Sequence, residues 1–465
     1  MNQARKNIRF IIFVFVILFA AMIFYLIYAI SVYGERWFVA PYNPRIASMK
    51  ENIIAGTIYD REGAKLAWSE GEKRRYTADG STRESVSHIV GDNFGLTRGA
   101  ESFFAKYLYG FDEDAVERLT GVLQGEKRKG SDITLTISAR LSDAILNTMG
   151  SRKGAVVVLN YKTGEVLASV SNPGFDPDKV KSYKGKTGSS VLFNRAFMGR
   201  YPPGSLFKVV TSAAVLENPE LELQTRNCTG KTEIEAKEVT CAGETAHGEV
   251  DLNRAFTKSC NTFFAQQAVL LNGERLKTEA EKFGFNLDFL FDDMIVYMSK
   301  FTQGDTDIDI AWSGIGQYED LITPLHAAMI AGTVANKGIM MEPRLLKSAV
   351  SPGASTLYTL YSKQYRNPVS EANANILKDM MLDVVKEGTG TGAKVSKLAV
   401  GGKTGTAEYT DEKGKKKEHA WFIGFIDDEK HPICLAVLLE GAGGGGKYAA
   451  PVAAKAFKKA VDLGY

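Results

Sequence analysis

Residues 201–208, YPPGSLFK, hold the strongest structural signal in this chain of 465 residues. Two prolines and a glycine do not easily continue a helix or a strand, whereas residues 206–216 carry apolar side chains at helical spacing. The sequence therefore predicts a helix that opens at Ser205 and places the Lys208 amine within reach of the Ser205 hydroxyl. A lysine held in a dry pocket beside a second cation can be neutral enough to take a proton from a serine.

Two more motifs follow at intervals of about 50 and 140 residues, Ser259-Cys260-Asn261 and Lys403-Thr404-Gly405-Thr406. Lys403 would supply the second cation, and Ser259 could relay a proton between Lys208 and a leaving group. Asn261 could donate to a substrate carbonyl or accept from Lys208, and Gly405 would let a substrate backbone approach closely. The N–H groups of Ser205 and Thr406 are the natural donors to an oxyanion. Each motif alone is common at helix starts, turns and loops, but the three in this order indicate serine acyl transfer.

These motifs resemble the three active-site motifs of class B penicillin-binding proteins, the monofunctional peptidoglycan transpeptidases, in a short-pedestal form. The similarity covers most of residues 131–465 and, more weakly, residues 56–67. Other segments that agree with the family are Gly154–Leu159, Thr163–Ala168, Asn194-Arg195-Ala196, Gly316-Gln317, Thr323-Pro324-Leu325, Glu387–Gly390 and His419–Phe422.

This resemblance implies D,D-transpeptidase chemistry, in which the serine attacks the penultimate D-Ala of a stem peptide and passes the acyl group to an amine of a neighbouring strand. It implies inhibition by β-lactams and no cofactor for catalysis. It also implies a polytopic peptidoglycan glycosyltransferase as partner, in cell elongation and shape, cell division or sporulation. Alternatives within the same fold are a penicillin-binding sensor, a β-lactamase and a catalytically silent scaffold.

The N-terminal region predicts a membrane anchor. Residues 10–30 carry no charge and, as a helix, would span about 31 Å. Arg5, Lys6 and Arg9 precede them, which favours a cytoplasmic N-terminus and an extracytoplasmic catalytic domain. The alternative is a cleaved signal peptide, although its apolar core would normally be shorter. The overall charge is nearly balanced, with 57 basic and 54 acidic residues, and does not indicate a nucleic-acid partner.

We expect four regions: a cytoplasmic tail (1–9), a transmembrane anchor (10–30), a juxtamembrane connector with a pedestal (31–130), and a transpeptidase domain (131–465). The last should be an α/β domain with a five-stranded, mostly antiparallel sheet covered by helices, together with a helical subdomain at about 205–390. The expected strands lie at 155–159, 165–170, 397–404, 420–426 and 433–439, and a last helix is expected at 452–463. Residues 443–446, all glycine, suggest a mobile loop.

Three of the four cysteines, Cys228, Cys241 and Cys260, lie near one another in the sequence, with His247 between the last two. A Cys228–Cys241 disulfide is one interpretation, but it leaves Cys260 and His247 unexplained. A structural zinc ion with three thiolates and one imidazole explains all four, and free thiols are the third possibility. The zinc interpretation also follows from the resemblance, since some elongation-type class B members hold a metal beside the second motif.

The sequence context also suggests roles for Cys434, His419 and Gln317. Cys434, in an apolar strand, suggests a small core residue. His419, beside Trp421 and Phe422, is interpreted as structural. Gln317, after Gly316, either braces the floor of the active site or reflects turn chemistry.

Overall fold

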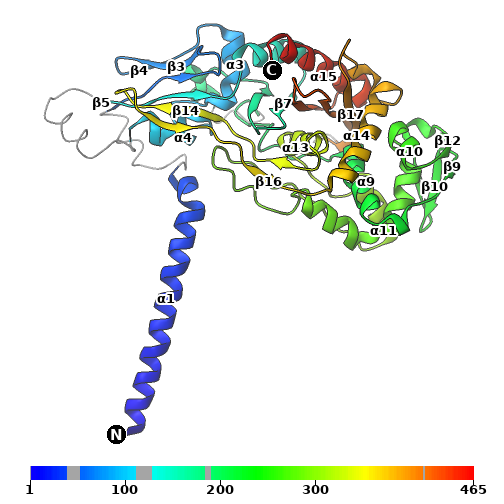
Figure 1. The fold of residues 1–465 in the computed structure, drawn as a ribbon, viewed down its shortest axis with the longest axis horizontal. Coiled ribbons are helices and arrows are strands. Elements are labelled where there is room, and N and C mark those ends of the chain that lie inside the picture. Colours follow the sequence, from blue (N-terminus) through cyan, green and yellow to red (C-terminus); the bar gives the residue numbers. More distant parts are fainter. Residues whose placement is uncertain (1, 39–52, 111–127, 184–189, 412–413) are drawn as a thin grey trace.

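The computed structural model describes residues 2–38, 53–110, 128–183, 190–411 and 414–465. The N-terminal helix α1 spans Asn2–Phe38, and within it Arg5–Ser31 is long and apolar enough to cross a membrane (Figure 1). It is the one such helix in the described part of the chain. Most of the expected juxtamembrane connector, residues 39–52, lies outside the described residues.

A five-stranded antiparallel sheet forms the centre of the catalytic region, in the order β17-β18-β19-β7-β8. Its strands are β7 (Gly154–Asn160), β8 (Val166–Asn172), β17 (Val400–Thr410), β18 (Lys416–Ile426) and β19 (Ile433–Leu439). The prediction of a five-stranded sheet made from both ends of the domain is confirmed. The apolar runs of β7 and β19 are buried throughout because helices cover both faces of the sheet.

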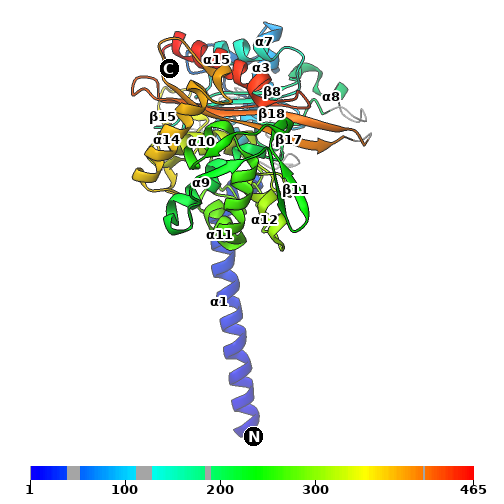
Figure 2. The same cartoon turned by 90° about the vertical axis from the view of Figure 1, so that its right-hand side faces the viewer.

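Two layers of helices enclose this sheet (Figure 2). On one face lie α7 (Ala139–Met149) and α15 (Gly445–Asp462), and their side chains join Val156, Val158 and Val437 in one core. The other face packs on α9 (Lys208–Glu217) and α13 (Pro324–Ala335), which share a second core with Val157 and Ala436. Successive strand residues thus contribute to different cores, as the pleat requires.

The glycine run was partly mispredicted. Gly445 and Gly446 belong to the first turn of α15, so the last helix begins earlier than residue 452. A Cβ on Gly445 would lie 2.2 Å from the Trp421 carbonyl oxygen and 2.3 Å from the Gly405 carbonyl oxygen. The glycine is therefore needed for close packing of the helix start on the sheet.

A second, six-stranded sheet has the order β15-β14-β6-β2-β3-β4. Four of its strands are β2 (Ile58–Tyr59), β3 (Lys65–Glu70), β4 (Lys73–Tyr76) and β6 (Asp132–Leu135). The other two, β14 (Leu346–Val350) and β15 (Thr356–Thr359), come from the middle of the range expected to be the transpeptidase domain. The expected boundary at residue 131 therefore falls inside a continuous sheet.

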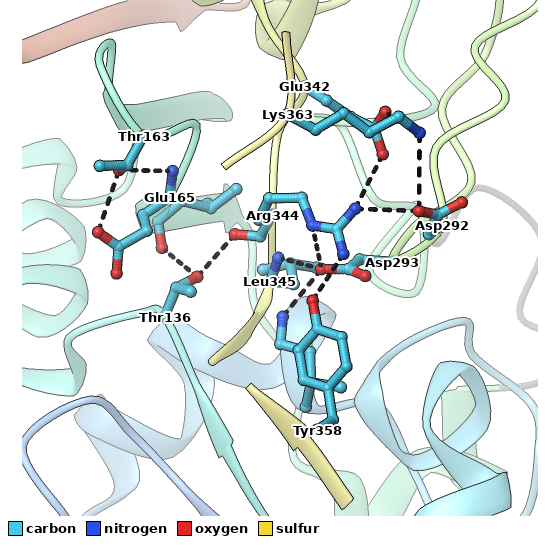
Figure 3. Close-up of polar contacts among 12 residues, drawn as sticks. Thr136, Thr163, Glu165, Asp292, Asp293, Glu342, Arg344, Leu345, Tyr358 and Lys363 are labelled. Atoms are coloured by element: carbon cyan, nitrogen blue, oxygen red, sulfur yellow. Dashed lines mark hydrogen bonds and ion pairs between the residues drawn. The ribbon is translucent and has the colours of Figure 1, made fainter. Parts of the chain in front are cut away.

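Arg344 connects this second sheet to the segment at residues 292–293 (Figure 3). Its side chain is 1% exposed and lies 3.0 Å from an Asp292 carboxylate oxygen and 3.1 Å from one of Glu342. The Asp293 carboxylate accepts hydrogen bonds from the backbone N–H groups of Leu345 and Leu346, at 2.8 and 3.0 Å. A buried ion cluster thus holds the start of β14 in place.

The helical subdomain lies between β8 and β17 in sequence. Besides α9 and α13 it contains α10 (Leu252–Lys258), α11 (Asn261–Lys282), α12 (Asp307–Gly314) and α14 (Glu371–Lys386). Two small hairpin-like pairs, β9 (Arg226–Cys228) with β12 (Gly248–Val250), and β10 (Lys231–Ile234) with β11 (Lys237–Thr240), precede α10.

Candidate active site

Ser205 lies in a single 3₁₀ turn, Gly204–Leu206, that leads directly into α9. The turn is fitted tightly to the edge of β17. Gly204 has a φ of +53°, and a Cβ there would lie 2.5 Å from the Thr406 carbonyl oxygen. Its N–H donates to the Gly316 carbonyl at 2.9 Å. The expected position of Ser205, at a helix start beside the third motif, is therefore what the structure contains.

The second motif brings two buried lysines together. Lys208 Nζ donates to the Ser259 carbonyl at 2.8 Å and to Asn261 Oδ1 at 2.7 Å, and it lies 3.3 Å from Ser259 Oγ. Lys403 Nζ donates to Ser259 Oγ at 2.8 Å. The Ser259 hydroxyl therefore lies between the two amines. Ser259 has a left-handed backbone, with φ 57° and ψ 42°, where it ends α10, and this non-glycine conformation is costly.

Burial changes the charge of both lysines. Both side chains are inaccessible to solvent. Burial lowers the pKa of Lys208 to about 8, against the smaller opposing influence of Cys260 and Cys241. Burial, followed by repulsion from Lys208, places the pKa of Lys403 well below its usual value. Burial disfavours the charged form of Lys208, which is the environment that a lysine base requires.

The third motif presents a strand edge to Ser205. In the pairing of β17 with β18, Gly405 lies opposite Trp421 and Thr406 opposite Ala420. The Thr406 carbonyl accepts a hydrogen bond from Gln317 Nε2 at 3.0 Å, so it points away from β18. Because the N–H and C=O of one strand residue point to the same side, the Thr406 N–H also faces the edge beside Ser205.

Hydroxyl groups gather on the next part of this edge. Thr404 Oγ1 lies 2.6 Å from Thr389 Oγ1, and Thr406 Oγ1 accepts from the Gly445 N–H at 3.3 Å. Neither Thr389 nor Gly445 was predicted to take part in the site. The segment Glu387–Gly390 was a signal for Thr389, because it matched the family, but no pattern placed it against Thr404.

The four predicted metal ligands also meet. Cys228 ends β9, Cys241 follows β11, Cys260 precedes α11, and all four ligand atoms, including one from His247, lie within 4.8 Å of one another. The Cys228–Cys241 and Cys241–Cys260 sulfur separations are 3.8 and 3.9 Å, and Cys228 Sγ lies 3.5 Å from His247 Nδ1.

These separations fit a tetrahedral metal site. Zinc–sulfur bonds of about 2.3 Å place neighbouring sulfurs roughly 3.8 Å apart, whereas a disulfide needs about 2.05 Å. None of the four cysteines of the chain forms a disulfide. The Thr262 hydroxyl donates to Cys228 Sγ at 3.2 Å and lies 3.2 Å from Cys260 Sγ, a contact that orients the sulfurs.

His419 and Cys434 have packing environments. The His419 ring stacks on Tyr409 with centroids 4.0 Å apart, and its Nδ1 accepts from the Gly441 N–H at 3.3 Å. Burial lowers the pKa of His419 to about 4, so the ring is neutral near pH 7. Cys434 is fully buried in β19. Among the described residues, neither side chain forms a hydrogen bond with Lys208 or Lys403.

The fold and this arrangement of serine and lysine side chains define a serine acyltransferase, and comparisons with known proteins agree. A family model of the penicillin-binding protein transpeptidase domain matches residues 154–458. The chain belongs to this family, as a class B penicillin-binding protein, and it is a peptidoglycan D,D-transpeptidase.

Individual relatives are similar over most of the chain. The peptidoglycan D,D-transpeptidase PbpA of Mycobacterium tuberculosis is 32% identical over 72% of this chain and 73% of its own length. The MrdA transpeptidase of Haemophilus influenzae is 31% identical over 80% of this chain and 64% of its own length. The structure of M. tuberculosis penicillin-binding protein A as a ceftriaxone acyl-enzyme has a TM-score of 0.81 and 28% identity. It covers 89% of this chain and 99% of that one.

Proposed function

We propose that this transpeptidase forms its acyl-enzyme on Ser205, with Lys208 as the base. The observation that carries the proposal is the meeting of Lys208, Ser259 and Lys403 around one hydroxyl, beside the turn that holds Ser205. A neutral Lys208 takes the proton from Ser205 Oγ, and Oγ attacks the carbonyl carbon of the penultimate D-Ala. The N–H groups of Ser205 and Thr406 stabilise the oxyanion.

Two steps follow, the release of D-Ala to give the acyl-enzyme and the transfer of the acyl group to an amine, and Lys208 carries the proton in both. Protonated Lys208 returns its proton through Ser259 to the nitrogen of the terminal D-Ala, the C–N bond breaks, and free D-Ala leaves. An amine of a neighbouring strand attacks the ester carbonyl, gives up a proton to Lys208, and displaces Ser205, which is reprotonated. Asn261 holds Lys208 through its Oδ1 while its Nδ2 donates to the Thr240 carbonyl at 2.8 Å.

Substrate binding is assigned to the β17 edge. The hydroxyls of Thr404 and Thr406 are placed to donate to the terminal carboxylate of the stem peptide, and the Lys403 amine lies beside them, where it donates to the Thr404 carbonyl. Gly405 keeps the edge clear, since a Cβ there would lie 3.0 Å from the Leu206 side chain and from the Pro203 carbonyl oxygen. β-Lactams, which acylate relatives of this chain, should occupy the same edge.

Labelling with a fluorescent penicillin tests the nucleophile. The wild-type chain in detergent should gain one adduct on Ser205 by peptide mass analysis, and Ser205→Ala should gain none. Ser212→Ala is the matched control, because Ser212 is a buried serine of α9, the helix that follows the Ser205 turn. An adduct that persists in Ser205→Ala would refute the assignment, and rapid hydrolytic release from the wild type would favour a β-lactamase.

We propose that Cys228, Cys241, His247 and Cys260 hold a structural zinc ion. Because Cys260 lies between Ser259 and Asn261, the metal would fix the loop from which both residues reach the lysines. Elemental analysis should find one zinc per chain and none in Cys260→Ser. Stoichiometric absence from the wild type, or a Cys228–Cys241 disulfide by mass analysis, would end this proposal.

We propose the four-region division given above, with residues 1–9 cytoplasmic, residues 10–30 of α1 as a single-pass anchor, residues 31–130 as connector and pedestal, and residues 131–465 as the transpeptidase domain, which shares the six-stranded sheet with pedestal strands β2, β3 and β4. A polytopic peptidoglycan glycosyltransferase is proposed as the partner of the anchor and pedestal, in cell elongation or division. Co-purification with candidate polymerases in detergent tests this. Loss of binding on exchange of residues 10–30 for an unrelated apolar helix would support it, and binding to no candidate would oppose it.

A further inference from the structure

We propose that Gln317 is a positioning residue for acylation, which aims the Thr406 N–H at the developing oxyanion. The proposal rests on the function assigned to Ser205 and Thr406 above. The main evidence is one hydrogen bond, which Gln317 Nε2 donates to the Thr406 carbonyl at 3.0 Å. Oxyanion stabilisation depends on donors fixed before the reaction, so a group that fixes the Thr406 peptide acts on the transition state.

The backbone around Gln317 is itself held firmly. Gln317 N–H donates to the Trp312 carbonyl at 2.9 Å, and Gly316 N–H donates to the Ser313 carbonyl at 2.8 Å, which ties the pair to the end of α12. Gly316 has a φ of +73°, and a Cβ there would lie 2.2 Å from the Gly204 carbonyl oxygen. The pair therefore sits directly against the turn that carries the nucleophile.

The same segment connects to both oxyanion donors. Through the Gly316 carbonyl, which accepts from Gly204 N–H at 2.9 Å, it holds the residue before Ser205. Through the Gln317 side chain it holds the peptide that follows Thr406 N–H in β17. A second bond joins the turn to the sheet, from Trp421 Nε1 to the Pro202 carbonyl at 3.0 Å. Gln317 is thus the side-chain link between the GQ segment, residues 316–317, and the strand edge.

Edge strand β17 needs such a link. On one side it pairs with β18, and on the other it faces Gly204 and Gln317, with no strand paired to it on that side among the described residues. Without Gln317 the Thr406 peptide keeps its β18 neighbours but loses the contact that sets its tilt toward Ser205. The expected consequence is slower acylation with unchanged β-lactam binding, because the hydroxyls assigned above to ligand binding, those of Thr404 and Thr406, form their hydrogen bonds with Thr389 and Gly445 and not with Gln317.

Stopped-flow acylation of the full chain in detergent by a fluorescent penicillin separates the two effects. Gln317→Met, which removes the donor and keeps the length, should lower the acylation rate constant about tenfold and leave the dissociation constant of the initial complex within about twofold. Gln266→Met is the matched control, since Gln266 Nε2 also donates to a threonine, Thr232, at 2.8 Å, and neither residue belongs to the three active-site motifs. Its acylation should match that of the wild type.

A spectroscopic readout distinguishes positioning from general stability. The ester carbonyl of an acyl-enzyme made with ¹³C-labelled penicillin should absorb at higher frequency in Gln317→Met, because weaker oxyanion-hole bonds polarise it less. Gln317→Glu gives a second test that keeps the shape. Its defect relative to wild type should shrink as the pH falls and the carboxyl regains an O–H donor.

Two results would overturn the proposal: an acylation rate and carbonyl frequency in Gln317→Met equal to those of wild type, or a Gln317→Glu defect independent of pH. Failure of the underlying function looks different, since the wild type itself would then form no adduct on Ser205.

Discussion

Replacement of Arg344 by methionine should destabilise the chain by about 3 kcal/mol, because it leaves buried carboxylates without their cation. Arg344 is 1% exposed and lies 3.5 Å from Asp293 and 3.1 Å from Glu342, both themselves buried. Removing one partner of a buried ion cluster costs about 3–5 kcal/mol. The lower end applies because Lys363 remains 2.8 Å from Glu342 and Asp292 is half exposed.

The free energy of unfolding can be measured by urea denaturation in detergent, followed by tryptophan fluorescence. Lys363→Met is the control. Lys363 contacts Asp292 and Glu342, two of the carboxylates that Arg344 contacts, but it is 45% exposed, so its loss should cost less than about 1 kcal/mol. A loss below about 1 kcal/mol for Arg344→Met, or equal losses for both variants, would refute the argument.

The stability loss in Arg344→Met should depend on pH, and the pKa of Asp293 gives the direction of that dependence. Burial raises the pKa of Asp293, and Arg344 opposes this rise. Without Arg344 the folded-state pKa rises further, so the carboxyl binds a proton more tightly when folded than when unfolded. The loss in Arg344→Met should therefore be smallest near pH 4 and grow as the pH rises toward 7. Asp293→Asn added to Arg344→Met should recover part of the stability at pH 7.

Three further outcomes are expected. Acylation by penicillin should rise with pH and reach half its maximum near 8, where Lys208 loses its proton, and a rate that is flat from pH 6 to 9 would exclude Lys208 as the base. Burial raises the pKa of Asp320 well above 3.8, so the folded state loses stability as the pH rises from about 4 toward that raised pKa. Asp320→Asn should thus raise the melting temperature at pH 7.5 and have little effect at pH 4, and thermal unfolding at the two pH values measures this. Gly316→Ala should lower the melting temperature and the acylation rate together, because the Cβ would lie 2.2 Å from the Gly204 carbonyl oxygen; a variant equal to wild type in both assays would show that the turn can move.

The parts of this structure with short-range signals were predictable. The apolar runs at residues 155–159 and 165–170 predicted the neighbouring strands β7 and β8, and the prolines before Ser205 marked the start of its helix. The four metal-ligand candidates were identified by counting donors, and the structure brings their atoms together. Whether they bind zinc is still a proposal.

Other features depend on contacts between distant residues and have no local pattern. β14 joins β6 across more than 200 residues, which placed part of the second sheet inside the expected transpeptidase domain. Thr389 meets Thr404 because a loop after α14 packs on β17. Gly445 and Gly446 were expected in a loop, since glycine is poor in helices, but the close approach of α15 to the sheet outweighs that preference.

The order of strands in the central sheet has a consequence for synthesis on the ribosome. β7 pairs with β19, with Val158 opposite Leu435, and β17 reaches the sheet only through β18 and β19. A nascent chain that contains Ser205 but ends before residue 433 lacks β19. Its β7 therefore has one unpaired edge, and β17 is not held beside Ser205 by the sheet. Reactivity toward penicillin should appear only when nearly the whole polypeptide has been made, and prematurely terminated chains should be inert and prone to aggregate.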